Sequence, residues 1–529
     1  QALRVLKLFG NEDVKCVRPC VGPEQEYFLI DKAMYEKRKD LVFCGRTLFG
    51  AKPPKGQELD DHYFGAIKPR VEAYMEELNT ELWKLGILAK TEHNEVAPSQ
   101  HELAPIFSVA NIATDHNQLT MEIMQKVASR HDLVCLLAEK PFAGVNGSGK
   151  HNNWSLATDT GVNLFKPGET PYENAQFLLF LCAAVQSVDN YQDLLRLSVA
   201  TAGNDHRLGA NEAPPAVISI FLGDELTAIL DAIETDTPYS GTEKTILKLG
   251  VHVLPKFTRD TTDRNRTSPF AFTGNKFEFR MVGSSDSIAC ANIMLNAAMA
   301  ETLKEFADRL EGVPDFESAL HDLIKETIKA HKRIIFNGNG YDDAWITEAT
   351  EKRGLLNLRT TPDALATVLE KKNVEMLTSL KIFSEAEIHS RYEICLENYC
   401  KTVNIEGLTM VDMARKEILP AVEAYLGDLS GTVAAKTAAV PGLACKYEKE
   451  LISKLSKLAD EIGDAVSSLD TTLIRLKAVP DITDAAYVIR DVVLQKMAEL
   501  RVVCDEAESI TADKYWPFPT YGDLLFGVR

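Results

Sequence analysis

The chain lacks the sequence signs of a membrane protein, a secreted disulfide-rich protein and a zinc-knuckle protein. No apolar run approaches the roughly 18 residues of a membrane span, and no charged-then-apolar signal peptide opens the chain. The ten cysteines include no CxxC pair, and the nearest spacings are Cys16/Cys20 and Cys395/Cys400. These absences favour reduced thiols in a cytoplasmic protein.

Basic residues are scarce relative to acidic ones. Lysine and arginine total 58 against 77 aspartates and glutamates, which gives a formal net charge of −19. This charge argues against non-specific binding to nucleic acid or to an anionic membrane surface, so we expect neither as a partner. Metal ions, small molecules and further copies of the chain are the expected partners.

The pattern of the chain changes near residue 287. Residues 20–285 mix short strand-like segments with helical stretches at 66–85, 115–139 and 174–200, which indicates an α+β fold. Strand signals nearly vanish beyond that point and helices dominate. We therefore expect an α+β domain over residues 1–300 and a helical region over residues 301–529 that ends in a short tail.

A long apolar stripe lies between Pro441 and Pro480. Its residues recur every three or four positions, which predicts one long helix. Packing within the protein's own helical layer is the favoured interpretation, and a contact between subunits is the alternative. The stripe consists of Leu451, Leu455, Leu458, Ile462, Ala465, Leu469, Leu473 and Leu476.

Two glutamates, Glu24 and Glu26, lie one residue apart in an apolar segment. In a β-strand both carboxylates project on one face, while Tyr27 and Leu29 face the other. Two like charges placed this way favour a bound cation. A solvated strand face is an equal alternative, because charged residues are mostly exposed.

A second glutamate pair and a histidine extend this pattern. Glu95 and Glu102 flank a Pro-Ser turn, and a hairpin there could bring their carboxylates together, although exposed turn charges are an alternative. Residues 144–150 read GxxxxGK, but a P-loop would have Ser or Thr where His151 stands, and residues 152–156 alternate like a strand. His151 is therefore a candidate metal ligand, with a purely structural histidine as the alternative.

Cationic residues accompany these acids. Arg207 and Glu212 lie in a glycine- and proline-bearing loop, which by itself could be any surface loop. Lys276, Glu278 and Arg280 share one face of a predicted strand whose other face is apolar. Such a face suits an anionic substrate beside a metal, since the arginine fork matches phosphate and carboxylate. A structural ladder of ion pairs is the alternative.

Taken together, these segments predict a site for divalent metals and polyanions. Five of the six candidate ligands are carboxylates, which favours hard cations such as Mg²⁺ or Mn²⁺. With Arg207, Arg266, Lys276 and Arg280 added, the set suits phosphoryl transfer, which depends on positioning and charge neutralisation. The candidate ligands are Glu24, Glu26, Glu95, Glu102, His151 and Glu278.

Five segments resemble those of one enzyme family and follow its order. They are GPEQE (22–26), NEVAPSQHE (94–102), NGSGKHNNWS (146–155), RLGANEAPP (207–215) and NRTSPFAFTGNKFEFR (265–280). By these motifs the chain resembles glutamine synthetase, and it looks most like the large type III bacterial form. The resemblance implies a catalytic domain built on a curved antiparallel sheet that forms a split barrel flanked by helices.

The resemblance also implies roles for individual residues. Glu26, Glu95 and Glu102 would hold one metal ion, and Glu24, His151 and Glu278 a second. Glu212 would bind ammonium and take its proton. The other implied contacts are Arg207 with Asn146 and Gly147 for glutamate, Arg266 and Lys276 for the ATP phosphates, Arg280 for the transferred phosphoryl group, and Ser155 and Asn153 on the nucleotide side.

The implied reaction forms glutamine from glutamate, ammonium and ATP through γ-glutamyl phosphate. A γ-glutamyl-polyamine or γ-glutamyl-amide synthetase and a non-catalytic structural relative are the alternatives. The family also implies a ring-based homo-oligomer of two stacked hexamers. Only 23 residues precede Glu24, so we expect this chain to lack the family's N-terminal β-grasp domain.

Overall fold

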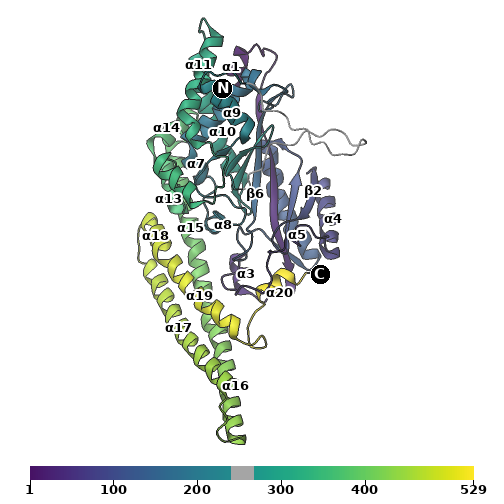
Figure 1. The fold of residues 1–529 in the computed structure, drawn as a ribbon, viewed down its shortest axis with the longest axis vertical. Helices are drawn as coiled ribbons and strands as arrows, with labels where there is room; N and C mark the ends of the chain where they lie inside the picture. Colours follow the sequence, from purple (N-terminus) through teal and green to yellow (C-terminus); the bar gives the residue numbers. More distant parts are fainter. Residues whose placement is uncertain (240–266, 529) are drawn as a thin grey trace.

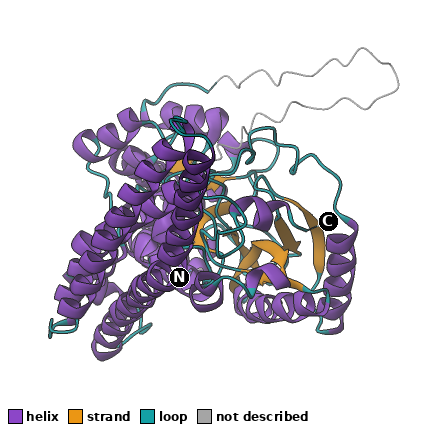
Figure 2. Ribbon diagram, turned by 90° about the horizontal axis from the view of Figure 1, so that it is seen from below, coloured by secondary structure: helices purple, strands orange, loops and turns teal. Residues whose placement is uncertain are grey.

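The computed structural model describes residues 1–239 and 267–528 (Figure 1). A twisted sheet occupies the middle of the molecule and helices pack beside it. A long arm of helices, formed by residues 385–510, extends away from the sheet. Seen along the long axis, the strands lie between a large group of helices and a smaller group at the opposite edge (Figure 2). None of the helices in the described ranges has the length and apolar character needed to cross a membrane.

Within the described residues, nine strands form the sheet. They are β1 (Val17–Asp31), β2 (Ala89–Asn94), β3 (Gln100–Pro105), β4 (Ser108–Val109), β5 (Leu133–Leu136), β6 (Gly149–Thr158), β7 (Ile220–Phe221), β8 (Phe270–Phe272) and β9 (Phe277–Gly283). Their order is β2-β3-β1-β6-β9-β8-β7, and β4 and β5 also pair with β1. The sheet is open, as the split-barrel expectation implies, but β7 and β8 pair in parallel rather than antiparallel.

Ten helices precede residue 311 in the described part of the chain. They are α1 (Ala2–Leu8), α2 (Lys32–Tyr35), α3 (Lys39–Cys44), α4 (Pro69–Lys84), α5 (Ala110–Arg130), α6 (Ala175–Asn190), α7 (Gln192–Leu197), α8 (Ala202–Arg207), α9 (Gly223–Glu234) and α10 (Ile288–Leu310). Tyr27 and Leu29 of β1 pack against α4 and α5, as the alternation of the strand predicts. The acidic face of the sheet is therefore the opposite one.

The helix predicted for residues 115–139 is wrong beyond Arg130. The chain turns at Asp132, whose φ of 53° lies in the left-handed region, and then forms β5. Phe28 to Asp31 of β1 pair with β5, so residues 133–136 satisfy their backbone groups in the sheet. This tertiary pairing overrides the helical pattern.

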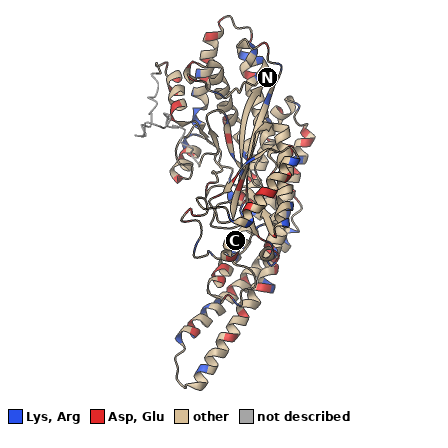
Figure 3. Ribbon diagram, turned by 90° about the vertical axis from the view of Figure 1, so that its right-hand side faces the viewer, with Lys and Arg blue, Asp and Glu red and all other residues tan. Residues whose placement is uncertain are grey.

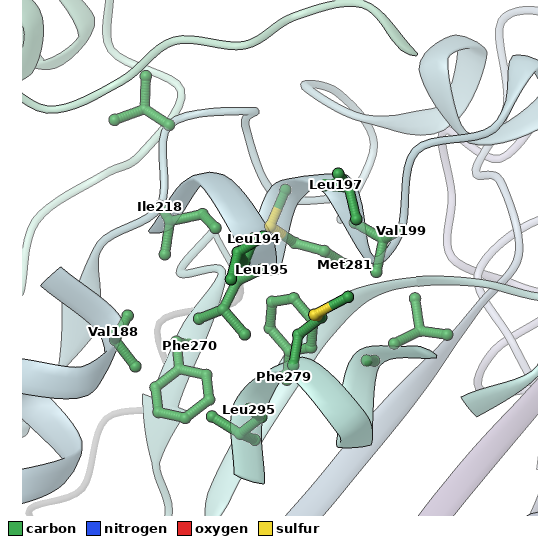
Figure 4. Packing of buried hydrophobic residues seen from close by; sticks show 14 of the residues in the cluster. Val188, Leu194, Leu195, Leu197, Val199, Ile218, Phe270, Phe279, Met281 and Leu295 are labelled. Atoms are coloured by element: carbon green, nitrogen blue, oxygen red, sulfur yellow. The ribbon is translucent and has the colours of Figure 1, made fainter. Parts of the chain in front are cut away.

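A phenylalanine-rich core supports the sheet from behind. Phe279 and Met281 of β9 point away from the acidic face and pack with Phe270 of β8 (Figure 4). Leu195 of α7 and Leu295 of α10 complete this layer. Burying apolar groups on one face of β9 fixes Glu278 and Arg280, which alternate with them, on the other face.

Helices dominate the rest of the molecule, and no strand lies beyond Gly283 in the described ranges, which confirms the helical expectation. The leucine stripe forms part of α17, and its buried members pack against α15, α16 and α19. This packing agrees with the favoured interpretation of the stripe. The remaining helices are α11 (Phe316–His331), α12 (Asp343–Thr347), α13 (Thr361–Ala366), α14 (Lys371–Ser379), α15 (Glu385–Met413), α16 (Leu419–Ala439), α17 (Lys446–Leu476), α18 (Ile482–Val488), α19 (Leu494–Ile510) and α20 (Tyr521–Phe526).

The C-terminal tail returns from the helical arm to the sheet. Helix α20 packs against Phe28 and Ile30 of β1, on the same face as the glutamates. The Ser99 hydroxyl, at the tip of the β2–β3 hairpin, donates a buried hydrogen bond of 2.8 Å to the Leu525 carbonyl. The tail thereby fixes the hairpin that carries Glu95 and Glu102.

Candidate metal and substrate site

Sheet register brings the predicted ligands together on one face. Glu26 of β1 lies opposite Glu102 of β3, and Glu24 lies opposite His151 of β6. Glu278 lies on β9, the next strand beyond β6. Facing residues in neighbouring strands have adjacent side chains, so three pairings of β-strands suffice to gather residues separated by more than 250 positions in the chain.

His151 is the centre of the first acidic cluster. Its Nδ1 atom lies 2.9 Å from Glu278 Oε1 and 3.3 Å from Glu24 Oε2, and its Nε2 atom lies 3.9 Å from Glu26 Oε1. Burial opposes protonation, but the hydrogen bonds to Glu24 and Glu278 raise the pKa of His151 well above its usual value. The acids thus favour the protonated form of this imidazole.

A second cluster lies on the β2–β3 hairpin. Glu95, Glu102 and His93 each offer a ligand atom, and the three atoms lie within 4.8 Å of one another. His93 Nε2 lies 2.9 Å from Glu102 Oε1, and the hydrogen bond between them raises the pKa of His93 to about 9. Burial, together with the charges of Glu26 and Glu102, raises the pKa of Glu95 to about 8.

The two clusters share Glu102. Its carboxylate also joins Glu24 and His151 in a second group of ligand atoms within 4.8 Å. The six residues singled out in the sequence therefore lie in one continuous region. The oxygen-rich donor set with imidazoles, crowded with buried like charges, suits hard divalent cations, which would neutralise the repulsion.

His93 is a candidate ligand that the sequence interpretation missed. The interpretation placed the turn at Pro98-Ser99, whereas the last strand pair before the loop is Asn94 with His101. Counting one pair outward places His93 opposite Glu102. The alternation of side chains along the hairpin could therefore have placed His93 beside Glu102. It did not do so because the register depends on the length of the loop, and in this loop Ser99 adopts a φ of 64°.

Glu212 lies at a strained loop above the second cluster. Asn211 and Glu212 have φ angles of 53° and 68°, and successive left-handed conformations in non-glycine residues are costly. Glu212 Oε2 accepts a hydrogen bond of 3.1 Å from Asn146 Nδ2. Its charge also contributes to the raised pKa of Glu95, after burial and the Glu26 and Glu102 charges.

Two residues outside the predicted motifs support this loop. The Tyr341 hydroxyl donates a hydrogen bond of 2.9 Å to the carbonyl of Ala213. Gln57 exchanges two hydrogen bonds with Asn146, at 2.8 and 2.9 Å. Both residues are distant in sequence from the segments they contact. No local pattern in the sequence marks them.

Arg207 is buried and its guanidinium faces the backbone of β9. Nη2 donates a hydrogen bond of 3.0 Å to the Arg280 carbonyl, and Nη1 lies within 3.4 Å of the Met281 and Val282 carbonyl oxygens. Gly149 allows this close approach, because a Cβ there would lie 2.0 Å from Arg207 Nη2 and would displace the guanidinium. Within the described residues Nε has no hydrogen-bond partner, so the predicted contact with glutamate would involve Nε or a rearranged fork.

Of the two cations of the β9 segment, Arg280 contacts the first cluster, whereas Lys276 contacts the turn before β9. Arg280 Nη2 donates 3.1 Å to Glu278 Oε2. Burial opposes ionisation of Glu278, yet His151 and Arg280 hold its pKa far below its usual value. Lys276 Nζ donates 3.1 Å to the Thr273 hydroxyl.

The remaining predicted contacts are placed as follows. Asn153 and Ser155 are themselves buried and share a face of β6 with His151 by strand alternation. Asn153 Nδ2 donates a hydrogen bond of 3.0 Å to the Gly22 carbonyl. The Gly147 carbonyl accepts 2.9 Å from Gln100 Nε2. Arg266 lies outside the described residues, so the structure does not place it.

Comparison with known proteins identifies this fold. Residues 1–218 match the family model described as "Glutamine synthetase, catalytic domain", and residues 319–437 match "Glutamine synthetase C-terminal domain". A glutamine synthetase of Butyrivibrio fibrisolvens is 50% identical over 543 residues, which covers 100% of this chain and 75% of the relative.

Two further relatives extend the comparison. The type-3 glutamine synthetase of Dictyostelium discoideum is 44% identical, covering 99% of this chain and 72% of its own length. A glutamine synthetase of Bacteroides fragilis is 45% identical, with 99% and 73% covered. These matches confirm the resemblance that the five motifs carry, and the chain belongs to the glutamine synthetase family.

Proposed function

We propose that this chain is a glutamate–ammonia ligase, which forms glutamine from glutamate and ammonium at the expense of ATP. The observation that supports this most directly is the convergence of five carboxylates and two histidines on one sheet face, bordered by Arg280 and Lys276. An acidic, cation-demanding centre beside basic side chains suits transfer of a phosphoryl group between two anions.

We propose Mg²⁺ or Mn²⁺ as the resident metals, one held by Glu24, His151 and Glu278 and the other by Glu26, Glu95 and Glu102, with His93 in reach of the second. The donor atoms fit such ions, as the crowded buried carboxylates indicate. When bound, the ions would neutralise the phosphate oxygens and the γ-carboxylate of glutamate.

The side chains of the protein supply the remaining chemistry. Arg280 and Lys276, with Arg266, would stabilise the phosphoryl group as it leaves ATP and forms γ-glutamyl phosphate. Asn153 and Ser155 would contact the nucleotide. Asn146, Gly147 and Arg207 would orient glutamate, and Glu212 would bind ammonium, accept its proton and exclude water from the acyl phosphate.

We further propose that the chain works in the cytoplasm as two stacked hexameric rings, with residues 1–300 as catalytic domain and residues 301–529 as a helical C-terminal region that ends in a short tail. All ten cysteines are free thiols, which suits a reducing compartment. Ile106, Phe107 and Leu88, near the edge strand β2, are 47%, 67% and 56% exposed, and such apolar exposure supports a contact between subunits. The native mass of the complex tests the assembly.

The activity is tested by phosphate release with glutamate, ATP and Mg²⁺, using ammonium in one arm and methylamine or putrescine in the other. Ammonium-dependent glutamine formation that falls when Glu212 is changed to Ala supports the proposal. Turnover with putrescine but not with ammonium would instead assign the chain to the γ-glutamyl-polyamine synthetases, and no turnover with any amine would leave only a structural role.

A further inference from the structure

A cavity separate from the residues of the predicted active site lies between the sheet and the helical arm. Its volume is about 500 Å³, which is within the range of small-molecule sites. Its walls are the end of β5 and the residues that follow it, the start of α8, the turn after β9, and one face of α15. None of the residues assigned above to metal, ATP or glutamate lines it.

Two carboxylates face this cavity from the sheet side. Glu139 is 4% exposed, and its Oε1 atom accepts hydrogen bonds from the backbone and hydroxyl of Ser285, at 2.9 and 2.6 Å. Asp286 Oδ2 accepts 3.2 Å from the Gly283 backbone. Neither carboxylate forms an ion pair with any residue that the structure describes.

Lys150 and Arg207 act on these acids through their charges, which oppose the rise that burial causes in the pKa of Asp286, but neither donates a hydrogen bond to either carboxylate among the described residues. Lys150 Nζ donates to Asn117 Oδ1, at 2.7 Å, and to the backbone carbonyl of Asp286 rather than to its carboxylate. Arg207 donates to the carbonyls of β9. Burial, followed by the charge of Glu139, raises the pKa of Asp286 to about 7, because two adjacent buried acids resist ionising together.

The arm side of the cavity adds no compensating positive charge. Arg46 and Glu406 neutralise each other through two hydrogen bonds of 2.6 and 2.7 Å. Tyr399 of α15 is 4% exposed, and its hydroxyl has no hydrogen-bond partner among the residues described. A buried hydroxyl without a partner costs free energy, which a bound ligand would recover.

We propose that this cavity binds a small molecule with a primary ammonium group, either a simple amine or a free amino acid. The ammonium group lies against Glu139 and Asp286, and the Tyr399 hydroxyl makes a further hydrogen bond to the ligand. An ammonium group has three donors, so it can donate to both carboxylates at once.

A ligand bound in this cavity can influence the predicted active site through α8. Gly203, near the start of this helix, packs so closely on Glu139 that a Cβ there would lie 2.2 Å from Glu139 Oε2. Arg207 ends the same six-residue helix. Resting on the proposed function, this geometry predicts that the ligand changes the KM for glutamate while leaving kcat nearly constant.

Binding is tested by calorimetry on the full chain without ATP, glutamate or metal ions, so that the result does not depend on the proposed reaction. The probes are methylammonium chloride and L-alanine, with sodium acetate as the control that lacks an ammonium group. Saturable binding of an ammonium probe supports the proposal, and its absence for both probes overturns it. Equal affinities assign the site to amines, and tighter binding of alanine assigns it to amino acids.

Variants locate the binding. Glu139→Gln combined with Asp286→Asn should weaken it by about tenfold or more, and Tyr399→Phe by a few-fold. Glu397→Gln, a conservative change at an exposed site on α15, should leave it unchanged. If the double variant does not fold, Asn398→Trp at the exposed rim should block entry. Undiminished binding in the double variant or in the folded Asn398→Trp variant would refute the assignment, as would loss of binding in Glu212→Gln alone.

Discussion

The acidic face of the sheet and the helical arm use charge in opposite ways. On the sheet face, Glu26, Glu95, Glu102 and Glu278 are each at most 9% exposed, and these buried acids are crowded together around His93 and His151. On the arm, charged residues are spread along the helices (Figure 3) and form exposed pairs such as Lys454 with Glu506, while leucines form the buried face of α17.

This difference separates the source of stability from the source of function. Buried like charges destabilise a folded chain until a cation neutralises them, whereas buried leucines stabilise it in any ionic condition. We therefore expect changes on the sheet face to remove activity at little cost in stability, and changes in the arm to do the reverse.

The largest effect is expected for His151→Ala. Because His151 contacts Glu24 and Glu278, its loss should lower kcat/KM by at least about 100-fold, since even indirect changes to metal sites cost ~10–100-fold. The metal-free protein also loses the hydrogen bonds of His151 to Glu24 and Glu278, so its melting temperature should fall, but by a change that is small beside the loss of activity. His321→Ala, at a histidine that is 53% exposed on α11, is the control. Full activity in His151→Ala would contradict the proposed separation of the residues needed for activity from those needed for stability.

The opposite result is expected for Leu473→Ala in α17. Leu473 is fully buried and packs against Gly407 of α15, so its truncation should cost about 2–5 kcal/mol of unfolding free energy. The neighbouring Ile474 is 61% exposed, and Ile474→Ala should cost little. Denaturant titration measures both. Equal losses for the two variants would show that the stripe does not support the fold.

A smaller effect should follow from Glu92, which is on the sheet but outside the predicted metal site. Both of its carboxylate oxygens are buried without a hydrogen-bond partner among the described residues, and burial raises its pKa to about 8. An acid with a raised folded-state pKa stabilises the protein below its unfolded pKa, and this contribution is lost as the pH rises towards 8.

Glu92→Gln should therefore flatten the decline in melting temperature as the pH rises from about 4.5, the unfolded value, to 8, and should be more stable than the wild type above pH 8. Glu76→Gln, on the exposed side of α4, should follow the wild-type curve. A slope that is identical in Glu92→Gln and the wild type would contradict the burial of an uncompensated acid.

The smallest effect links the two regions. Ser99→Ala removes the hydrogen bond from the hairpin to Leu525 of the tail, which should cost about 1 kcal/mol and raise the Mn²⁺ concentration for half-maximal activity a few-fold. Ser509→Ala, which removes an exposed hydrogen bond on α19, should leave the Mn²⁺ requirement unchanged. A shift in both variants would reflect general loosening rather than the tail contact.

The sequence predicted what local alternation and the motifs dictate. Two glutamates one residue apart must share a strand face, and the break in the GxxxxGK segment at His151 correctly excluded a P-loop helix, since residues 149–158 form β6. Pairing across long distances was not predictable. The end of α5 at Arg130, the placing of His93 opposite Glu102 and the tail contact at Ser99 each depend on a tertiary neighbour that no local pattern specifies.

We propose above that the clusters around His151 and Glu95 are two metal sites joined by Glu102. Titration of the metal-free protein with Mn²⁺, followed by electron paramagnetic resonance, tests it most directly by counting bound ions. We expect two tightly bound ions per chain in the wild type, one in His151→Ala and one in Glu95→Ala. An unchanged number of bound Mn²⁺ ions in both variants, or no tight binding in the wild type, would contradict the assignment of two metal sites.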